Sequence, residues 1–152
     1  MTMAYLTNSA NWIVACGTLF VVSCCVALHY EALVNCSRLL PKVTPHHRRR
    51  VLLTILVILV THIVEIWLFA LGYYVLTAQL GLGSFAGIAL AGLPDYAYYS
   101  AMVYTTVGFG DIFPTGPIRF MTGMEALTGF VMITWSASFT FLEMQRDWPR
   151  AP

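Results

Sequence analysis

The sequence is poor in charge: Asp, Glu, Lys and Arg make up 10% of its 152 residues, whereas a soluble domain carries roughly 25%. The net charge is only +1, which argues against a nucleic-acid partner. The four cysteines form no C-x-x-C pair. We therefore expect buried, reduced thiols, with zinc binding by Cys24, Cys25 and His29 as the weaker alternative. No nucleophile–base constellation or cofactor motif occurs, so we expect neither an enzyme nor a bound cofactor.

The chain contains long uncharged runs of mostly apolar residues. Hydrophobic residues make up 59% of the chain, and the mean hydropathy is +0.74. We predict membrane-spanning helices over residues 12–36, 51–76 and 118–142, because a span needs about 20 mostly apolar residues. The basic connector between the first two spans contains Pro41 and Pro45, which we expect to break the helix. Scattered glycines in residues 81–92 indicate a loose connector before the third span.

The placement of lysine and arginine predicts the orientation of the chain in the membrane. None precedes Arg38, and all but Arg119 lie in the connector or in the C-terminal tail with Arg146 and Arg150. We therefore expect a multi-pass protein of the cell (inner) membrane, with the N-terminus outside and the C-terminus cytoplasmic. The basic connector is also suited to contact anionic lipid headgroups.

A segment too short to span the membrane lies before the last span. Pro94 and Asp95 favour the start of a helix that we expect to reach Thr105. The motif Thr-Thr-Val-Gly-Phe-Gly-Asp then occupies residues 105–111. Its two glycines allow the backbone to alternate in handedness at little steric cost, so that successive carbonyls point the same way. A short helix followed by an extended loop predicts a re-entrant segment at membrane depth.

This motif resembles the selectivity filter of the potassium channel family, Thr-Val-Gly-Tyr-Gly-Asp, with Phe109 in place of the tyrosine. The resemblance covers about residues 51–142. It implies an all-α membrane protein whose outer helix, pore helix, filter loop and inner helix surround the ion path. The filter would bind permeant K⁺ through the carbonyl groups of four residues: Thr106, Val107, Gly108 and Phe109.

One filter segment and no internal repeat imply that four identical chains build the pore, as a fourfold homotetramer. We accordingly divide the chain into an extra N-terminal transmembrane helix with its basic connector, residues 1–50, and an ion channel pore domain, residues 51–152. The expected partners are K⁺, three further copies of the chain and the lipid bilayer.

The resemblance also implies residues that support the filter from behind. Asp111 would receive a hydrogen bond from an aromatic residue of the pore helix. Because Met102 stands where the family often has a polar partner, we expect a weakly braced filter that inactivates readily. Glu125 is expected to be a hydrogen-bonded group behind the filter, since a bare carboxylate there is costly. The predicted supporting residues are Thr105, Gly110, Asp111, Tyr98, Tyr99 and Glu125.

On the last span, Gly129 matches the glycine often proposed as a gating hinge in the family. The alternative is that this glycine only permits close helix packing, and the sequence leaves both open. Four residues at helical spacing are predicted to line the gate or cavity: Phe130, Ile133, Ala137 and Phe141. Near the inner mouth, Glu143 is expected to be solvated.

Ionisable residues also occur within the first two spans. His62 and Glu65 are three residues apart and share one helix face, whereas His29 and Glu31 are two apart and do not. One interpretation is that these groups find partners across helices and fix the extra helix to the pore domain. The other is a sensor of protons or divalent ions, because histidine titrates near neutrality.

Together these features predict a potassium-selective channel that conducts K⁺ passively across the membrane. Two alternatives remain open at this stage. The first is a weakly selective cation channel, if the carbonyl rings relax around Phe109. The second is a non-conducting metal-binding or accessory membrane protein that uses the histidine and carboxylate residues.

Overall fold

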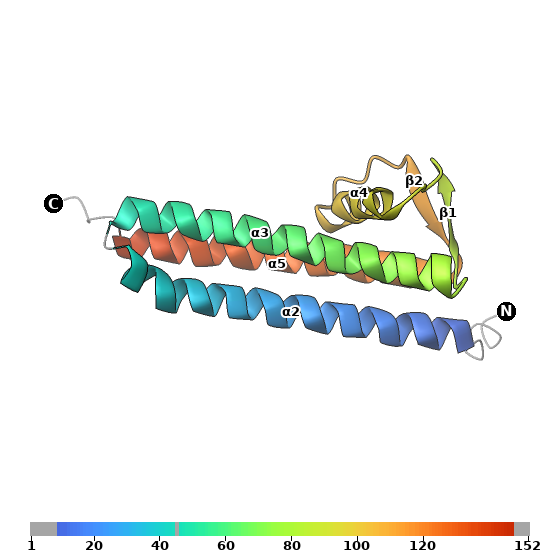
Figure 1. The fold of residues 1–152 in the computed structure, drawn as a ribbon, viewed down its shortest axis with the longest axis horizontal. Coiled ribbons are helices and arrows are strands. Elements are labelled where there is room, and N and C mark those ends of the chain that lie inside the picture. The colour runs from blue at the N-terminus through green and yellow to red at the C-terminus, as the bar shows by residue number, and fades with distance from the viewer. Residues whose placement is uncertain (1–8, 45, 148–152) are drawn as a thin grey trace.

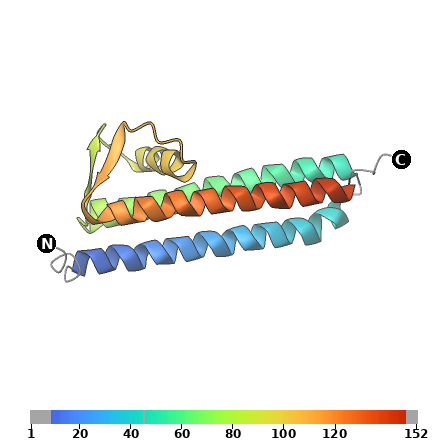
Figure 2. The same cartoon turned by 180° about the vertical axis from the view of Figure 1, so that it is seen from behind.

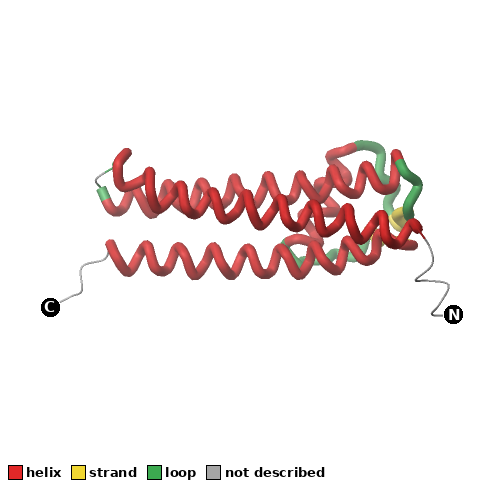
Figure 3. Tube along the Cα trace, turned by 90° about the horizontal axis from the view of Figure 1, so that it is seen from below, coloured by secondary structure: helices red, strands yellow, loops and turns green. Residues whose placement is uncertain are grey.

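The computed structural model of the chain describes residues 9–44 and 46–147. Three long helices lie side by side (Figures 1 and 3): α2 (Ser9–Val43), α3 (His47–Tyr74) and α5 (Arg119–Asp147). The helix α3 runs antiparallel to the other two. Each of the three is long and apolar enough to cross a membrane, so helices of the required length occur at all three predicted spans.

The turn between the first two helices is shorter than predicted. The helix α2 continues through Pro41, so the expected break at this proline is wrong. Pro41 lies in the last turn, where its missing N–H removes only one intrahelical hydrogen bond. The helix α3 begins at His47, so the arginines of residues 48–50 belong to its first turn rather than to a loop. Pro45 and Arg150 lie outside the described residues.

The connector after α3 is more ordered than its glycines suggest. A π-helical turn, Val75–Gln79, extends α3, and the strand β1 (Ser84–Gly87) follows. This strand pairs antiparallel with β2 (Ile112–Thr115), with Gly87 opposite Ile112. Figure 2 shows this two-stranded sheet beside the long helices, near one of their ends. The sheet was not predicted from the sequence, because its second strand comes only after the glycine-rich motif.

The short helix α4 (Leu93–Tyr104) lies beside α3 at the same end of the molecule as the sheet (Figure 1). It begins near the predicted position because Asp95 caps it. The carboxylate of Asp95 accepts hydrogen bonds from the backbone N–H groups of Ala91, at 2.6 Å, and Gly92, at 3.0 Å. Acceptors at this position satisfy N–H groups that have no partner inside the helix.

The four helices meet in a core that contains polar as well as apolar side chains. Phe69 and Tyr73 of α3 and Met121 of α5 are fully buried. So are His29 and Glu65, although charged groups are rarely fully buried unless they are paired.

At the far end of the helices, Glu143 is buried, with 7% of its surface exposed, so the prediction that it is solvated was wrong. It lies close enough to Cys36 of α2 to interact with it electrostatically. The reason is that α2 and α5 remain packed together towards their C-terminal ends.

Candidate ion-conduction site

The backbone after α4 alternates in handedness. Thr106, Gly108 and Gly110 have φ angles of 61°, 52° and 77°, and Thr106 is the one non-glycine residue with positive φ in the described part of the chain. Every second residue of the motif is therefore left-handed, which is the conformation expected from its glycines. A β-branched residue such as Thr106 adopts positive φ at a cost of roughly 1–2 kcal/mol.

The motif forms an exposed surface on the single chain. Residues 105–110 are all exposed, and the side chains of Val107 and Phe109 are 54% and 71% accessible. The loop is tied to the end of α4 by backbone hydrogen bonds, from Thr106 to Val103 at 2.9 Å and from Gly108 to Met102 at 3.1 Å. In the single chain, the motif is therefore a surface loop anchored to the end of α4.

Asp111 is held by side-chain and backbone contacts. The hydroxyl of Tyr98 donates a hydrogen bond to Asp111 Oδ2 at 2.7 Å, and this bond raises the pKa of Tyr98. The backbone N–H of Ile88, just after β1, donates to the carbonyl oxygen of Asp111 at 3.0 Å. A Cβ atom on Gly87 would lie 2.0 Å from that same oxygen, so only glycine fits there. The sheet therefore fixes the C-terminal end of the motif.

The neighbouring Tyr99 points elsewhere. Its hydroxyl lies 3.0 Å from Thr122 Oγ1 of α5, and its ring packs edge-on against Tyr73 and Phe85 at centroid distances of 5.2 Å and 4.7 Å. Of the two tyrosines considered from the sequence, Tyr98 contacts Asp111 and Tyr99 anchors α4 to the long helices.

Glu125 of α5 links three helices, α3, α4 and α5, through hydrogen bonds. Its side chain is fully buried, and it accepts hydrogen bonds from Tyr73 of α3 at 2.6 Å and Ser100 of α4 at 2.5 Å. Ser100 also lies 2.8 Å from the carbonyl oxygen of Ile66. This contact set leaves Glu125 inside the protein rather than on the surface that carries the motif.

The C-terminal end of α4 rests directly on α5. A Cβ atom on Gly129 would lie 2.0 Å from the carbonyl oxygen of Tyr104, the last residue of α4. The hydroxyl of the next residue, Thr105, donates to the carbonyl oxygen of Ala101 at 2.7 Å and satisfies part of the helix end. Close packing at Gly129 is therefore a feature of the fold.

The residues predicted to line the gate share one exposed face of α5. Phe130 and Phe141 are each 58% accessible and Ile133 is 39% accessible, while Ala137 between them is also exposed. This stripe continues away from the motif along the length of the helix.

Four helices contribute to a buried polar cluster that we call the histidine cluster: His29, His62, Glu65, Tyr104 and Ser136. Nδ1 of His29 lies 3.0 Å from Glu65 Oε1, and Nδ1 of His62 lies 3.0 Å from Glu65 Oε2. The hydroxyl of Tyr104 donates to Glu65 Oε2 and lies 2.9 Å from Nδ1 of His62. The Oγ atom of Ser136 lies 3.1 Å and 3.2 Å from Nε2 of His29 and His62.

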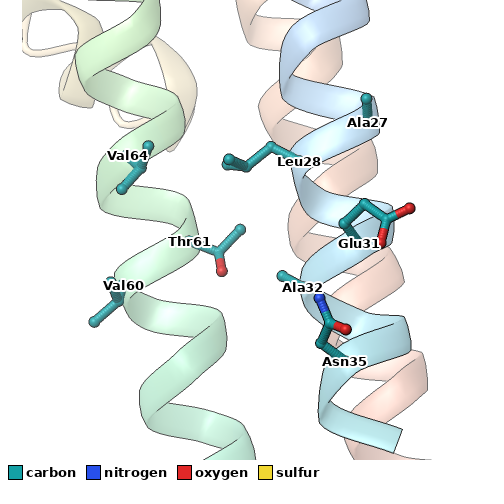
Figure 4. A pocket seen from close by; sticks show the side chains of 8 residues that line it. All are labelled: Ala27, Leu28, Glu31, Ala32, Asn35, Val60, Thr61 and Val64. Atoms are coloured by element: carbon teal, nitrogen blue, oxygen red, sulfur yellow. The ribbon is translucent and has the colours of Figure 1, made fainter. Parts of the chain in front are cut away.

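The sequence placed only part of this cluster. It put His62 and Glu65 on one helix face, but it grouped His29 with Glu31. Tyr104 and Ser136 carried no signal, since hydroxyl residues are common in apolar helices. Glu31 is exposed and lines a groove of about 540 Å³ between α2 and α3, together with Asn35 and Thr61 (Figure 4).

Most of the chain resembles a known protein family. Residues 53–146, more than half of the chain, match the ion-channel family. Protein LctB of Geobacillus stearothermophilus is 40% identical to the chain over 61 residues, which is 40% of this chain and 44% of LctB. The chain thus matches less than half the length of this relative. No solved structure matches the chain.

The family match begins in α3 and ends in α5, so it includes α4, the glycine-rich motif and Glu125. Together with three apolar helices of sufficient length, it supports a multi-pass membrane protein. The chain belongs to the ion-channel family.

Proposed function

We propose that the protein is a potassium-selective channel in which the carbonyl groups of residues 106–109 bind K⁺ in succession. The alternation of positive φ angles at Thr106, Gly108 and Gly110 carries this proposal. Carbonyl oxygens that point the same way replace the water around a desolvated cation. The K⁺ ions are the permeant species, and no other cofactor is needed.

The proposed assembly is a fourfold homotetramer. The motif is exposed on the single chain, and so is the α5 stripe that contains Phe130, Ile133 and Phe141. Four chains around one axis would cover both surfaces and place four motifs opposite one another, since closed symmetry is the usual arrangement of identical subunits. The lipid-facing surface then comes from α2 and α3.

In this arrangement α4 is a re-entrant pore helix. Its 12 residues span about 18 Å, well short of the hydrocarbon core of roughly 30 Å. Its C-terminal residue, Tyr104, leads directly into the motif. The negative end of the α4 dipole would therefore face the ion path below the filter and favour a cation there.

We propose that the filter opens to the outside of the cell (inner) membrane. The sheet and α4 lie at one end of the long helices, and the basic turn between α2 and α3 lies at the other (Figure 1). Basic residues favour the cytoplasmic side. The N-terminus is then outside and the C-terminus inside. The division of the chain into an N-terminal helix with its connector, residues 1–50, and a pore domain, residues 51–152, stays a prediction.

The test is conduction by the purified protein in liposomes with K⁺ on one side and Na⁺ on the other. We expect a reversal potential close to the K⁺ equilibrium value and a tetramer mass in mild detergent. A reversal potential near zero would replace K⁺ selectivity with a weakly selective cation pore, for which Phe109 is the first residue to examine. A monomer mass without current would refute the proposal and favour an accessory protein.

A further inference from the structure

We propose that the histidine cluster binds a divalent transition-metal ion with the chemistry of Zn²⁺. The ligands are His29 of α2 and His62 and Glu65 of α3, and Tyr104 supplies a further oxygen. This inference goes beyond ion conduction and does not depend on K⁺ selectivity. It gives the extra N-terminal helix a function, because one of the three principal ligands comes from α2.

The candidate ligand atoms already lie close to one another. One ligand atom from each of His29, His62 and Glu65 lies within 4.8 Å of the others. Both contacts of Nδ1 atoms with the Glu65 carboxylate are 3.0 Å. Ligands at 2.0–2.1 Å from a tetrahedral zinc ion are separated from one another by roughly 3.3 Å. Small side-chain shifts would therefore convert the hydrogen-bonded arrangement into a coordinated one.

The chemistry of the ligands matches a transition metal. Two imidazoles and one carboxylate form the His₂Glu set found in zinc sites and in sites of non-haem iron. The side chains of His29 and Glu65 are fully buried, and that of His62 is 15% exposed. A buried carboxylate is costly unless a positive charge accompanies it. A divalent ion supplies that charge and leaves both histidines neutral.

The position of Ser136 provides an independent argument. Its oxygen faces Nε2 of both His29 and His62, while both Nδ1 atoms face Glu65. If the two histidines are neutral and each Nδ1 donates a proton to Glu65, both Nε2 atoms are acceptors. The single Ser136 hydroxyl hydrogen then satisfies only one of them.

A metal on the Nδ1 side removes this conflict. Each Nε2 atom then carries a proton, and both donate to the two lone pairs of the Ser136 oxygen. A ligating histidine almost always donates its other N–H to an oxygen in this way. Two solutions remain without a metal. One is a doubly protonated histidine, and the other is a His62 whose Nδ1 accepts from Tyr104 and whose Nε2 donates to Ser136. The experiment below distinguishes both from a bound metal.

A bound metal ion would connect α2 to the residues at which the proposed filter begins. Tyr104, which contacts both His62 and Glu65, is the last residue of α4, and the motif begins at the next residue. Ser136 lies on α5, one helical turn beyond Ile133 of the exposed stripe. The ion would thus hold α2 against α3 at the point where the pore helix and the inner helix meet them.

The experiment measures metal binding by the purified full-length protein in detergent, without an affinity tag and after treatment with a chelator. Zn²⁺ is titrated with thermal unfolding as the readout, and bound metal is counted by elemental analysis after gel filtration. Co²⁺ serves as a spectroscopic probe because its visible absorption reports coordination. We expect one Zn²⁺ per chain, a rise in the unfolding temperature and a Co²⁺ spectrum without thiolate charge-transfer bands.

Variants assign the site to these residues. We expect His29→Ala and Glu65→Gln to weaken Zn²⁺ binding at least 100-fold, and Ser136→Ala to weaken it by about 10-fold, as loss of an outer partner typically does. Glu31→Gln changes an exposed residue two positions from His29 and is the matched control, with unchanged binding expected. If His29→Ala does not fold, the Co²⁺ spectrum of the unaltered protein and of Ser136→Ala decides.

Three outcomes would overturn the proposal. They are no Zn²⁺ binding by the chelator-treated protein, binding that His29→Ala and Glu65→Gln leave unchanged, and a Co²⁺ spectrum with thiolate bands. Without any Zn²⁺ binding, the histidine cluster would be a hydrogen-bonded polar cluster only. Either of the other two results would mean that Zn²⁺ binds at a different site. Potassium current has no part in these readouts, so the metal site and the proposed conduction fail or succeed separately.

Discussion

Substituting Gly129 with alanine separates two roles for this residue, a gating hinge and a packing contact. In the structure, the new Cβ atom would lie 2.0 Å from the carbonyl oxygen of Tyr104 and 2.8 Å from its carbonyl carbon. A backbone group cannot rotate away as a flexible side chain can. The end of α4, and with it the start of the motif, would have to move away from α5.

The expected magnitude follows from two opposing contributions. Alanine in a helix interior is favoured over glycine by about 1 kcal/mol. Overpacking costs about 1–3 kcal/mol, and we expect the upper end because the neighbour of Gly129 is backbone. The net loss in the free energy of unfolding is therefore about 2 kcal/mol.

Gly123 is the matched control on the same helix. In the single chain, a Cβ atom at this position would meet nothing within 4 Å, so Gly123→Ala should stabilise α5 by up to about 1 kcal/mol. The two alanine variants should then differ by about 3 kcal/mol, more than 100-fold in the unfolding equilibrium.

The assay is unfolding of each purified variant in mixed detergent micelles, followed by K⁺ flux from liposomes. We expect Gly129→Ala to be destabilised and to lose flux, and Gly123→Ala to be at least as stable as the unaltered protein. If Gly129→Ala instead matched the unaltered protein in stability and changed only the opening of the channel, the packing argument would be wrong and the hinge would be favoured.

Three further predictions concern the filter and its support. Phe109→Tyr should slow the decay of current by adding a hydroxyl group that can brace the filter, and identical decay in both proteins would contradict this. The bond from Tyr98 to Asp111 raises the pKa of Tyr98, so its contribution is complete below pH about 10 and is lost as the pH rises through the raised value. Current should therefore fall at strongly alkaline pH, and Tyr98→Phe should be insensitive there. Ser100→Ala should lower the free energy of unfolding by about 1–3 kcal/mol, because it removes a hydrogen bond from buried Glu125; chemical denaturation would show whether it does.

Much of the fold could be predicted because its signals are local. The three spans follow from runs of apolar residues, and the start of α4 follows from Pro94 and Asp95. The expected helix ends were less accurate, since Pro41 is tolerated in the last turn of α2. The strand β1 could not be predicted, because its partner strand Ile112–Thr115 is distant in sequence: Ser84 pairs with Thr115, 31 residues away.

The candidate site divides in the same way. The glycines of the motif predicted a backbone of alternating handedness, and the structure has positive φ at Gly108 and Gly110. Which tyrosine reaches Asp111 could not be deduced, because Tyr98 and Tyr99 are equally close in sequence and differ only in the direction they face from α4. The role of Ser136 could not be predicted, because a lone hydroxyl residue in an apolar helix has no specific sequence pattern.

The sequence by itself determined that this chain has three helices long and apolar enough to cross a membrane, and a loop of alternating backbone handedness. Hydropathy and glycine conformation both act over a few residues. Tertiary structure alone decided that His29 pairs with Glu65, 36 residues away, rather than with nearby Glu31. It also decided that Gly129 receives the end of α4. The physical reason is that buried polar groups and close backbone contacts are satisfied between helices, and only the packing of α2, α3, α4 and α5 sets those distances.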